Sequence, residues 1–180
     1  MKEDRYRDEA VKLLKLQKHD MVNYLQVALS YIQLNKSQEA EKYLKHAMLE
    51  LQRNESILNI VYPKLVISLL SKIYTTFKSA IPLTVDCKSN LENTYVYEEL
   101  LTELLEKVWD EVIVSQLKSP QENRSIDFII DSNDNFIFVG NNLKVHIETE
   151  TINELNILFS KIGYSVVCSD EVLRISKEQT

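Results

Sequence analysis

The chain has 180 residues, of which 44% are hydrophobic and 27% charged, so it is long and apolar enough to bury a core. It contains only two glycines, Gly140 and Gly163, whereas phosphate-binding loops, dinucleotide fingerprints and nucleotide lids each need several glycines close together. Its net charge of −6 argues against nucleic acid and anionic membranes as partners, because both favour clusters of Lys and Arg. We therefore expect a globular protein built mainly of long elements, with no nucleic acid and no membrane partner.

The N-terminal segment and the cysteines indicate the compartment. Residues 1–8 are rich in charge and no apolar run follows them, and no stretch approaches the ~18 apolar residues of a membrane span. Cys87 and Cys168 lie far apart and match no metal-ligand spacing, so we interpret them as two reduced thiols. These features predict a cytoplasmic protein without a signal peptide or a transmembrane segment.

The first 60 residues contain neither glycine nor proline, and their apolar residues recur at intervals of three and four. The periodicity stops near residue 35 and then resumes, which predicts two helices joined by a short turn. The apolar positions are Val11, Leu14, Met21, Leu25, Ala28 and Ile32 in the first helix and Ala40, Leu44, Ala47, Leu51 and Leu58 in the second. Because such wide apolar faces need more cover than one partner helix supplies, we expect two chains to form a four-helix bundle. Packing of the hairpin against the rest of its own chain is the alternative.

The sequence pattern of the remaining residues, 61–180, predicts an α+β domain. Pro63 suits the first turn of a helix, so we expect the boundary between two domains to lie at residues 60 and 61. The predicted elements are a helix at 63–79, a strand at 81–87, a helix at 96–117, a hairpin of strands 125–130 and 136–139, an alternating strand-like run at 143–148, a helix at 151–162 ended by Gly163, and strands at 164–168 and 172–175. This order predicts three helices and a mixed or antiparallel sheet.

The first predicted helix carries a polar patch around His19. Asn23 and Gln26 follow His19 by four and seven residues and therefore share its face, whereas Asp20 points about 100° around the helix. A solvated histidine beside a solvated aspartate is the plainer interpretation of this patch. A histidine on the flank of a rigid helix also suits nucleophilic chemistry, because neutral imidazole has a free lone pair near neutral pH.

The other two histidines lie in ordinary secondary-structure patterns. His46 falls on the second predicted helix and His146 in the alternating run, and we interpret both as structural or surface residues. No group of His, Cys, Asp and Glu has the spacing of a metal site, so we expect no metal centre.

The segment His19-Asp-Met-Val-Asn-Tyr-Leu-Gln26 resembles the phosphoacceptor box of two-component dimerisation domains. It is closest to the form found in the sporulation initiation phosphotransferase B family and in citrate-sensor-like kinases. The order of elements, a helical hairpin followed by a small α+β domain similar to a reduced kinase ATPase domain, extends the resemblance over nearly the whole chain. The resemblance implies a cytoplasmic homodimer in which His19 takes a phosphoryl group from the aspartate of one response-regulator receiver and passes it to the aspartate of a second. It also implies control of sporulation initiation, with a single-domain response regulator as donor and a transcription factor as acceptor.

The sequence differs from histidine kinases in the motifs that bind ATP. Kinase ATPase domains carry an asparagine-rich box on their first long helix, an Asp-x-Gly-x-Gly turn and a glycine-rich lid. Here the corresponding helix reads Leu104-Leu-Glu-Lys-Val-Trp-Asp-Glu-Val-Ile113, without asparagine, and the strand Phe136-Ile-Phe-Val-Gly-Asn-Asn142 has one glycine. We therefore expect the chain to bind neither ATP nor a cofactor of its own, with Mg²⁺ supplied by the docked receiver. Trp109 is expected in the core.

Roles for the residues around His19 follow from the resemblance. Asp20 is expected to orient the imidazole. The residues expected to contact the receiver or stabilise the phosphoryl group are Lys18, Val22, Asn23 and Gln26, with a place in the bundle core as the alternative for Val22. Hairpin geometry, and not the resemblance, places Arg53 opposite His19 as a further candidate contact, with an ordinary surface cation as the alternative. Two other functions stay open: an atypical ATP-dependent histidine kinase, and a non-catalytic dimeric adaptor.

Overall fold

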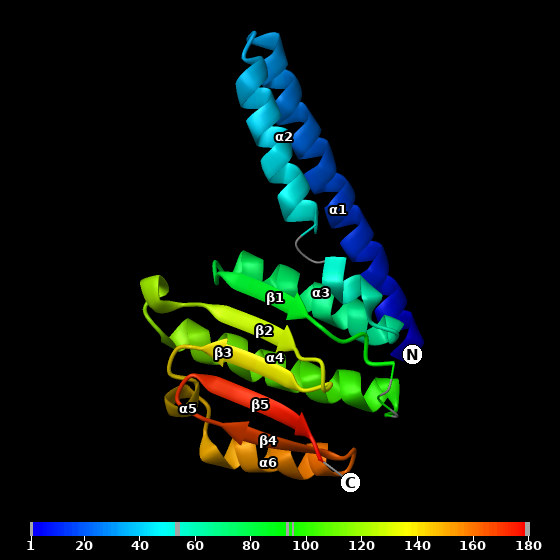
Figure 1. Ribbon diagram of the computed structural model, residues 1–180, viewed down its shortest axis with the longest axis vertical. Helices are drawn as coiled ribbons and strands as arrows, with labels where there is room; N and C mark the ends of the chain where they lie inside the picture. Colours follow the sequence, from blue (N-terminus) through cyan, green and yellow to red (C-terminus); the bar gives the residue numbers. More distant parts are fainter. Residues whose placement is uncertain (1, 53–54, 93, 95, 179–180) are drawn as a thin grey trace. The chain divides into compact units, whose positions relative to one another are not determined.

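The computed structural model describes residues 2–52, 55–92, 94 and 96–178. The chain divides into two compact units, Met1–Glu55 and Ser56–Thr180 (Figure 1). Residues 56–60, which the sequence pattern assigned to the helical domain, contribute Ile57 and Ile60 to the core of the second unit. Two helices followed by an α+β unit confirm the predicted fold class.

The first unit is the predicted hairpin of two long helices, α1 (Lys2–Gln33) and α2 (Ser37–Gln52). Asn35 in the turn between them has a φ of 57°, a left-handed conformation that asparagine tolerates better than most residues. Its amide and that of Lys36 donate 2.9 Å hydrogen bonds to carbonyls of the last turn of α1. No helix in the described part of the chain has both the length and the apolarity that a membrane crossing requires.

Aromatic and small side chains pack the two helices together. The Tyr43 ring lies between those of Tyr24 and Tyr31, with centroid distances of 6.2 and 6.1 Å. The small residues Ala28 and Ala40 are almost fully buried. These contacts set the register of the hairpin and place the His19 region of α1 opposite the C-terminal end of α2.

The second unit contains one five-stranded sheet in the order β1-β2-β3-β5-β4. Its strands are β1 (Leu83–Cys87), β2 (Ile126–Ile130), β3 (Phe136–Gly140), β4 (Tyr164–Cys168) and β5 (Val172–Lys177). β1 pairs with β2 in parallel, and the other three pairings are antiparallel. The predicted mixed sheet and the β2–β3 hairpin are therefore confirmed.

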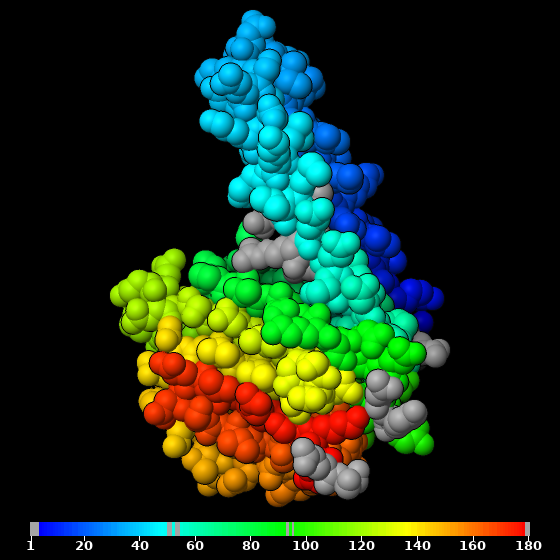
Figure 2. Space-filling model, viewed as in Figure 1, coloured from blue at the N-terminus to red at the C-terminus, as the bar shows by residue number. Residues whose placement is uncertain are grey.

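Three main helices lie on one face of this sheet: α3 (Pro63–Lys78), α4 (Glu98–Lys118) and α6 (Thr149–Ser160) (Figure 1). Between the two layers, the Trp109 ring packs 5.1 Å from each of Phe128 and Phe138, centroid to centroid, and only 1% of Trp109 is exposed. The described residues leave the opposite face of the sheet uncovered, and Figure 2 shows it with β3 in yellow and β5 in red. The prediction that Trp109 belongs to the core is confirmed.

The prediction of a strand at residues 143–148 is wrong. The segment contains a short helix, α5 (Leu143–His146), because Asn142 takes a φ of 54° and turns the chain after β3. Leu143 and Ile147 are buried and Val145 is 75% exposed, as expected where positions four residues apart share a helical face. His146 therefore ends a helical turn and does not lie on a strand.

Two short 3₁₀ helices complete the secondary structure of the described residues: η1 (Glu55–Asn59) and η2 (Gln121–Asn123). The apolar periodicity that the sequence carries as far as Leu58 thus outlasts α2, which ends at Gln52. Gly163 has a φ of 76° just after α6, in the position expected for a glycine that ends a helix.

Candidate functional site

His19 lies in the second half of α1, and 71% of its side chain is exposed. Helix α1 runs without interruption for 32 residues, so a side chain on it projects from a rigid support. The ring of His19 is thus open to a large macromolecular reactant while its Cα position is held by the helix. Such an arrangement suits a nucleophile that reacts with a group on another protein.

Two neighbours contact the same ring nitrogen of His19. Asp20 Oδ1 lies 3.3 Å and Asn23 Nδ2 3.2 Å from His19 Nδ1. The Asn23 contact follows from the four-residue spacing on a helix. Because Nδ1 has one position for a proton or a lone pair, it either donates to the Asp20 carboxylate or accepts from the Asn23 amide.

The remaining expected contact residues on α1 are exposed. Lys18, Val22 and Gln26 all present accessible side chains, with 42% of Val22 exposed. They surround His19 with one cation, one aliphatic group and one amide, which is a suitable set for a protein surface carrying an anionic group. Arg53 lies outside the described residues.

Other candidate nucleophiles lie in less suitable surroundings. Burial raises the pKa of the Cys87 thiol to about 11 and outweighs a hydrogen bond with Ser56, which acts to lower this pKa. Burial also raises the pKa of Cys168. Since the thiolate is the reactive form, both thiols are poor nucleophiles near neutral pH. Among the described residues, no group of three or more His, Cys, Asp or Glu is arranged to hold a metal ion.

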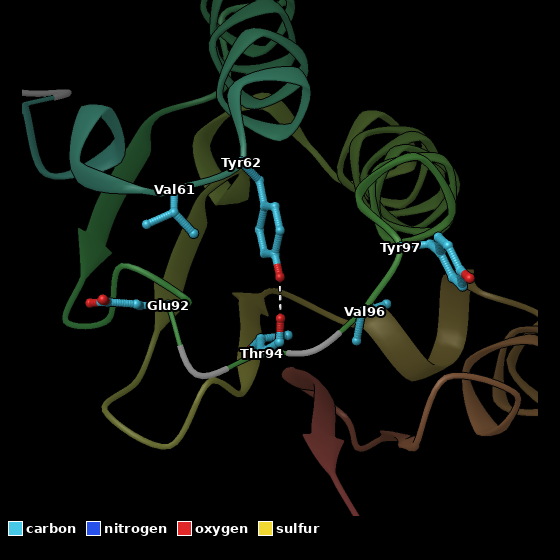
Figure 3. A pocket seen from close by; sticks show the side chains of 6 residues that line it. All are labelled: Val61, Tyr62, Glu92, Thr94, Val96 and Tyr97. Atoms are coloured by element: carbon cyan, nitrogen blue, oxygen red, sulfur yellow. Dashed lines mark hydrogen bonds between the residues drawn. The ribbon is translucent and has the colours of Figure 1, made fainter.

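The second unit has a shallow hollow of about 480 Å³ (Figure 3). Its described lining consists of Val61, Tyr62, Glu92, Thr94, Val96 and Tyr97. The Tyr62 hydroxyl donates a hydrogen bond to the Thr94 carbonyl across this lining, as Figure 3 shows. Because the charged group among these residues is a carboxylate, the hollow is poorly suited to phosphate.

At the C-terminal end of β3, a side chain from α4 fills the space beside the strand. Gln116 is fully buried, and its Nε2 donates a 2.9 Å hydrogen bond to the Asn141 carbonyl, while its Oε1 accepts one of 3.3 Å from the Ser125 amide. Gly140 admits this packing, because a Cβ there would lie 2.8 Å from Gln116 Nε2. This contact joins residues distant in sequence, so no local pattern signals it.

We expect Gly140→Ala to destabilise the second unit by about 1–3 kcal/mol, because the added methyl overlaps the Gln116 amide. Gln116→Ala removes that amide, so the double variant should be less destabilised than the sum of the two single variants. Urea denaturation followed by circular dichroism measures all three. Purely additive losses would contradict the described packing.

A known family of helical domains is similar to the hairpin. Residues 1–60 match the family model described as the alpha-helical domain of SpoOB-type sensor kinases. Among solved structures, the cytoplasmic segment of histidine kinase QseC matches at 15% identity, covering 79% of this chain and 95% of that chain with a TM-score of 0.46. No curated protein sequence matches the chain. The family match covers the hairpin and therefore includes His19 and its neighbours on α1.

Proposed function

We propose that the chain is a phosphotransferase of two-component signalling, in which His19 carries a phosphoryl group from the aspartate of one receiver domain to that of another. The observation that carries the proposal is an exposed histidine whose Nδ1 lies beside a carboxylate, on a hairpin similar to the helical domain of sensor kinases. Control of sporulation initiation is the role that the sequence resemblance favours, with a single-domain regulator as donor and a transcription factor as acceptor.

The transfer requires one lone pair and one acceptor on this chain. The Nε2 lone pair of His19 forms a bond to phosphorus in line as the phosphorus–oxygen bond of the aspartyl phosphate breaks, and the receiver aspartate leaves as a carboxylate. The ring then carries a positive charge, with its Nδ1–H donated to Asp20, whose negative charge stabilises it. Reversal of these steps on a second receiver returns the electron pair to the ring.

The surrounding side chains support binding and charge stabilisation. Lys18 offers a cation to the phosphoryl oxygens, Gln26 offers an amide, and Val22 gives the receiver an apolar contact. We also assign Arg53 to the receiver contact, on sequence grounds. Because phosphoryl transfer depends mainly on positioning and charge, we expect Mg²⁺ and the remaining cations to come with the docked receiver.

Transfer without ATP is supported by the second unit. The buried Gln116 side chain occupies the space beside Gly140, at the end of the strand that the sequence resemblance compares with the Asp-x-Gly-x-Gly turn of kinase ATPase domains. The segment has one glycine where a nucleotide site needs several, and the space beside that glycine is filled, which favours a phosphotransferase over a kinase.

A four-helix bundle of two hairpins is the assembly that fits the exposed apolar residues. Several large apolar side chains of the hairpin are half or more exposed: Leu14, Met21, Leu25, Leu29, Ile32, Met48 and Leu49. A second hairpin would cover such residues, as expected of an isologous dimer interface.

We expect Leu25→Glu to weaken the dimer by about a hundredfold or more, because burying an unpaired carboxylate costs several kcal/mol. Light scattering after size exclusion measures the change. Gln38→Glu, which adds the same charge at an exposed polar position of α2, should leave the dimer intact. A wild-type chain that is monomeric at every concentration would contradict the proposed assembly.

Label transfer separates the proposal from its two alternatives. The chain is incubated with a ³²P-phosphorylated receiver, and a second receiver is then added. We expect the label to appear on the chain and then on the second receiver. A non-catalytic adaptor would never acquire label. Robust labelling of the chain by γ-³²P-ATP and Mg²⁺ alone would instead identify a histidine kinase.

A further inference from the structure

Two side chains compete for one nitrogen of the His19 ring. Asp20 Oδ1 and Asn23 Nδ2 lie 3.3 and 3.2 Å from Nδ1. A carboxylate accepts a hydrogen bond, so its contact requires a proton on Nδ1, whereas an amide NH₂ donates one and requires a lone pair there. The neutral ring carries a single N–H. The two contacts therefore belong to two different tautomers of His19.

The tautomer decides whether Nε2 is a nucleophile. With the proton on Nδ1, which Asp20 favours, Nε2 has a free lone pair. With Asn23 donating to Nδ1, the proton lies on Nε2, and this nitrogen cannot attack phosphorus. Asp20 thus promotes the reactive tautomer and Asn23 opposes it.

We propose that Asn23 is a positioning residue that holds part of the free protein in the unreactive tautomer and releases it when the phosphoryl group of a receiver attracts its amide. This inference rests on the proposed function. An anionic phosphoryl oxygen is a stronger acceptor for the amide than a neutral imidazole nitrogen. Asn23 and His19 are both exposed, so the amide turns away without disturbing the hairpin core.

Release of Asn23 couples docking to reactivity. Once the amide has left, water takes the proton from Nε2 and returns one to Nδ1. The new Nδ1–H group then donates a hydrogen bond to the Asp20 carboxylate. The Nε2 lone pair then forms the nitrogen–phosphorus bond as the phosphorus–oxygen bond of the aspartyl phosphate breaks, and the aspartate leaves as a carboxylate. The ring is therefore reactive mainly when a phosphoryl group is present.

The tautomer ratio of His19 is measurable in the free protein. Long-range ¹H–¹⁵N correlation spectra of the ¹⁵N-labelled chain, recorded at a pH where the ring is neutral, report which nitrogen carries the proton. We expect the ratio of Nε2–H to Nδ1–H to fall about threefold in Asn23→Ala, since an exposed hydrogen bond contributes little net free energy. It should fall further in Asn23→Asp, whose carboxylate accepts from Nδ1–H, and rise in Asp20→Ala.

Gln17→Ala is the matched control, because Gln17 is an exposed side chain of α1 two residues before His19 and faces another direction. Its tautomer ratio should equal that of the wild type. A ratio unchanged in Asn23→Ala, or one that moves toward Nε2–H, overturns the inference. The spectra need no receiver, so a failure of phosphoryl transfer would refute the proposed function while leaving the tautomer result intact.

Discussion

Replacing His19 by glutamine is expected to lower phosphoryl transfer between two receivers by at least about a thousandfold, because the variant lacks the nucleophile. The stability of the chain should change by less than about 0.5 kcal/mol, since 71% of the His19 side chain is exposed. Transfer is followed by the appearance of ³²P on the second receiver, and stability by urea denaturation.

The matched control for this variant is His46→Gln, which removes another exposed histidine of the same hairpin, on α2. We expect it to transfer phosphate at the wild-type rate. Equal losses in the two variants would show that His19 is not the phosphoacceptor. Full activity of His19→Gln would lead to the same conclusion.

Replacing Trp109 by alanine is expected to destabilise the second unit by about 3–5 kcal/mol, the usual cost of removing a buried aromatic side chain. Trp109 is 1% exposed and packs against Phe128 and Phe138 between the helices and the sheet. Because a whole domain is stable by only about 5–15 kcal/mol, this loss is a large share of the total. Urea denaturation followed by far-ultraviolet circular dichroism measures it.

Phe77→Ala provides the comparison, because it removes an aromatic side chain of α3 that is 76% exposed. We expect its free energy of unfolding to stay within about 0.5 kcal/mol of the wild-type value. Trp109→Phe should be milder than Trp109→Ala, since no described residue accepts a hydrogen bond from the indole Nε1. Similar losses for Phe77→Ala and Trp109→Ala would contradict the described core.

Much of the fold follows from the apolar periodicity and the turn residues of the sequence. The long helices, the β2–β3 hairpin and the start of α3 at Pro63 all carry local signals. The segment 143–148 carries no such unambiguous signal. Its apolar residues at every second position are typical of a strand, but they also permit one helical turn when Asn142 turns the chain. A tertiary constraint, the burial of Leu143 and Ile147 on one helical face, decides its conformation.

The candidate site was less fully predictable. Helical spacing brings Asn23 to the face of His19, and adjacency brings Asp20 near it, so both could be named from the sequence. Their competition for one nitrogen depends on side-chain orientation, which spacing does not fix. The filling of the space beside Gly140 by Gln116 depends on a contact between α4 and β3, and no local sequence pattern indicates such a contact.

The most direct test of the account is to locate the phosphoryl group on the chain itself. The protein is incubated with a phosphorylated receiver in the absence of ATP, digested under alkaline conditions that preserve phosphohistidine, and analysed by tandem mass spectrometry. We predict a phosphoramidate on the peptide that contains His19. Phosphate on a different residue, or a chain that stays unmodified while the receiver remains phosphorylated, would contradict the account.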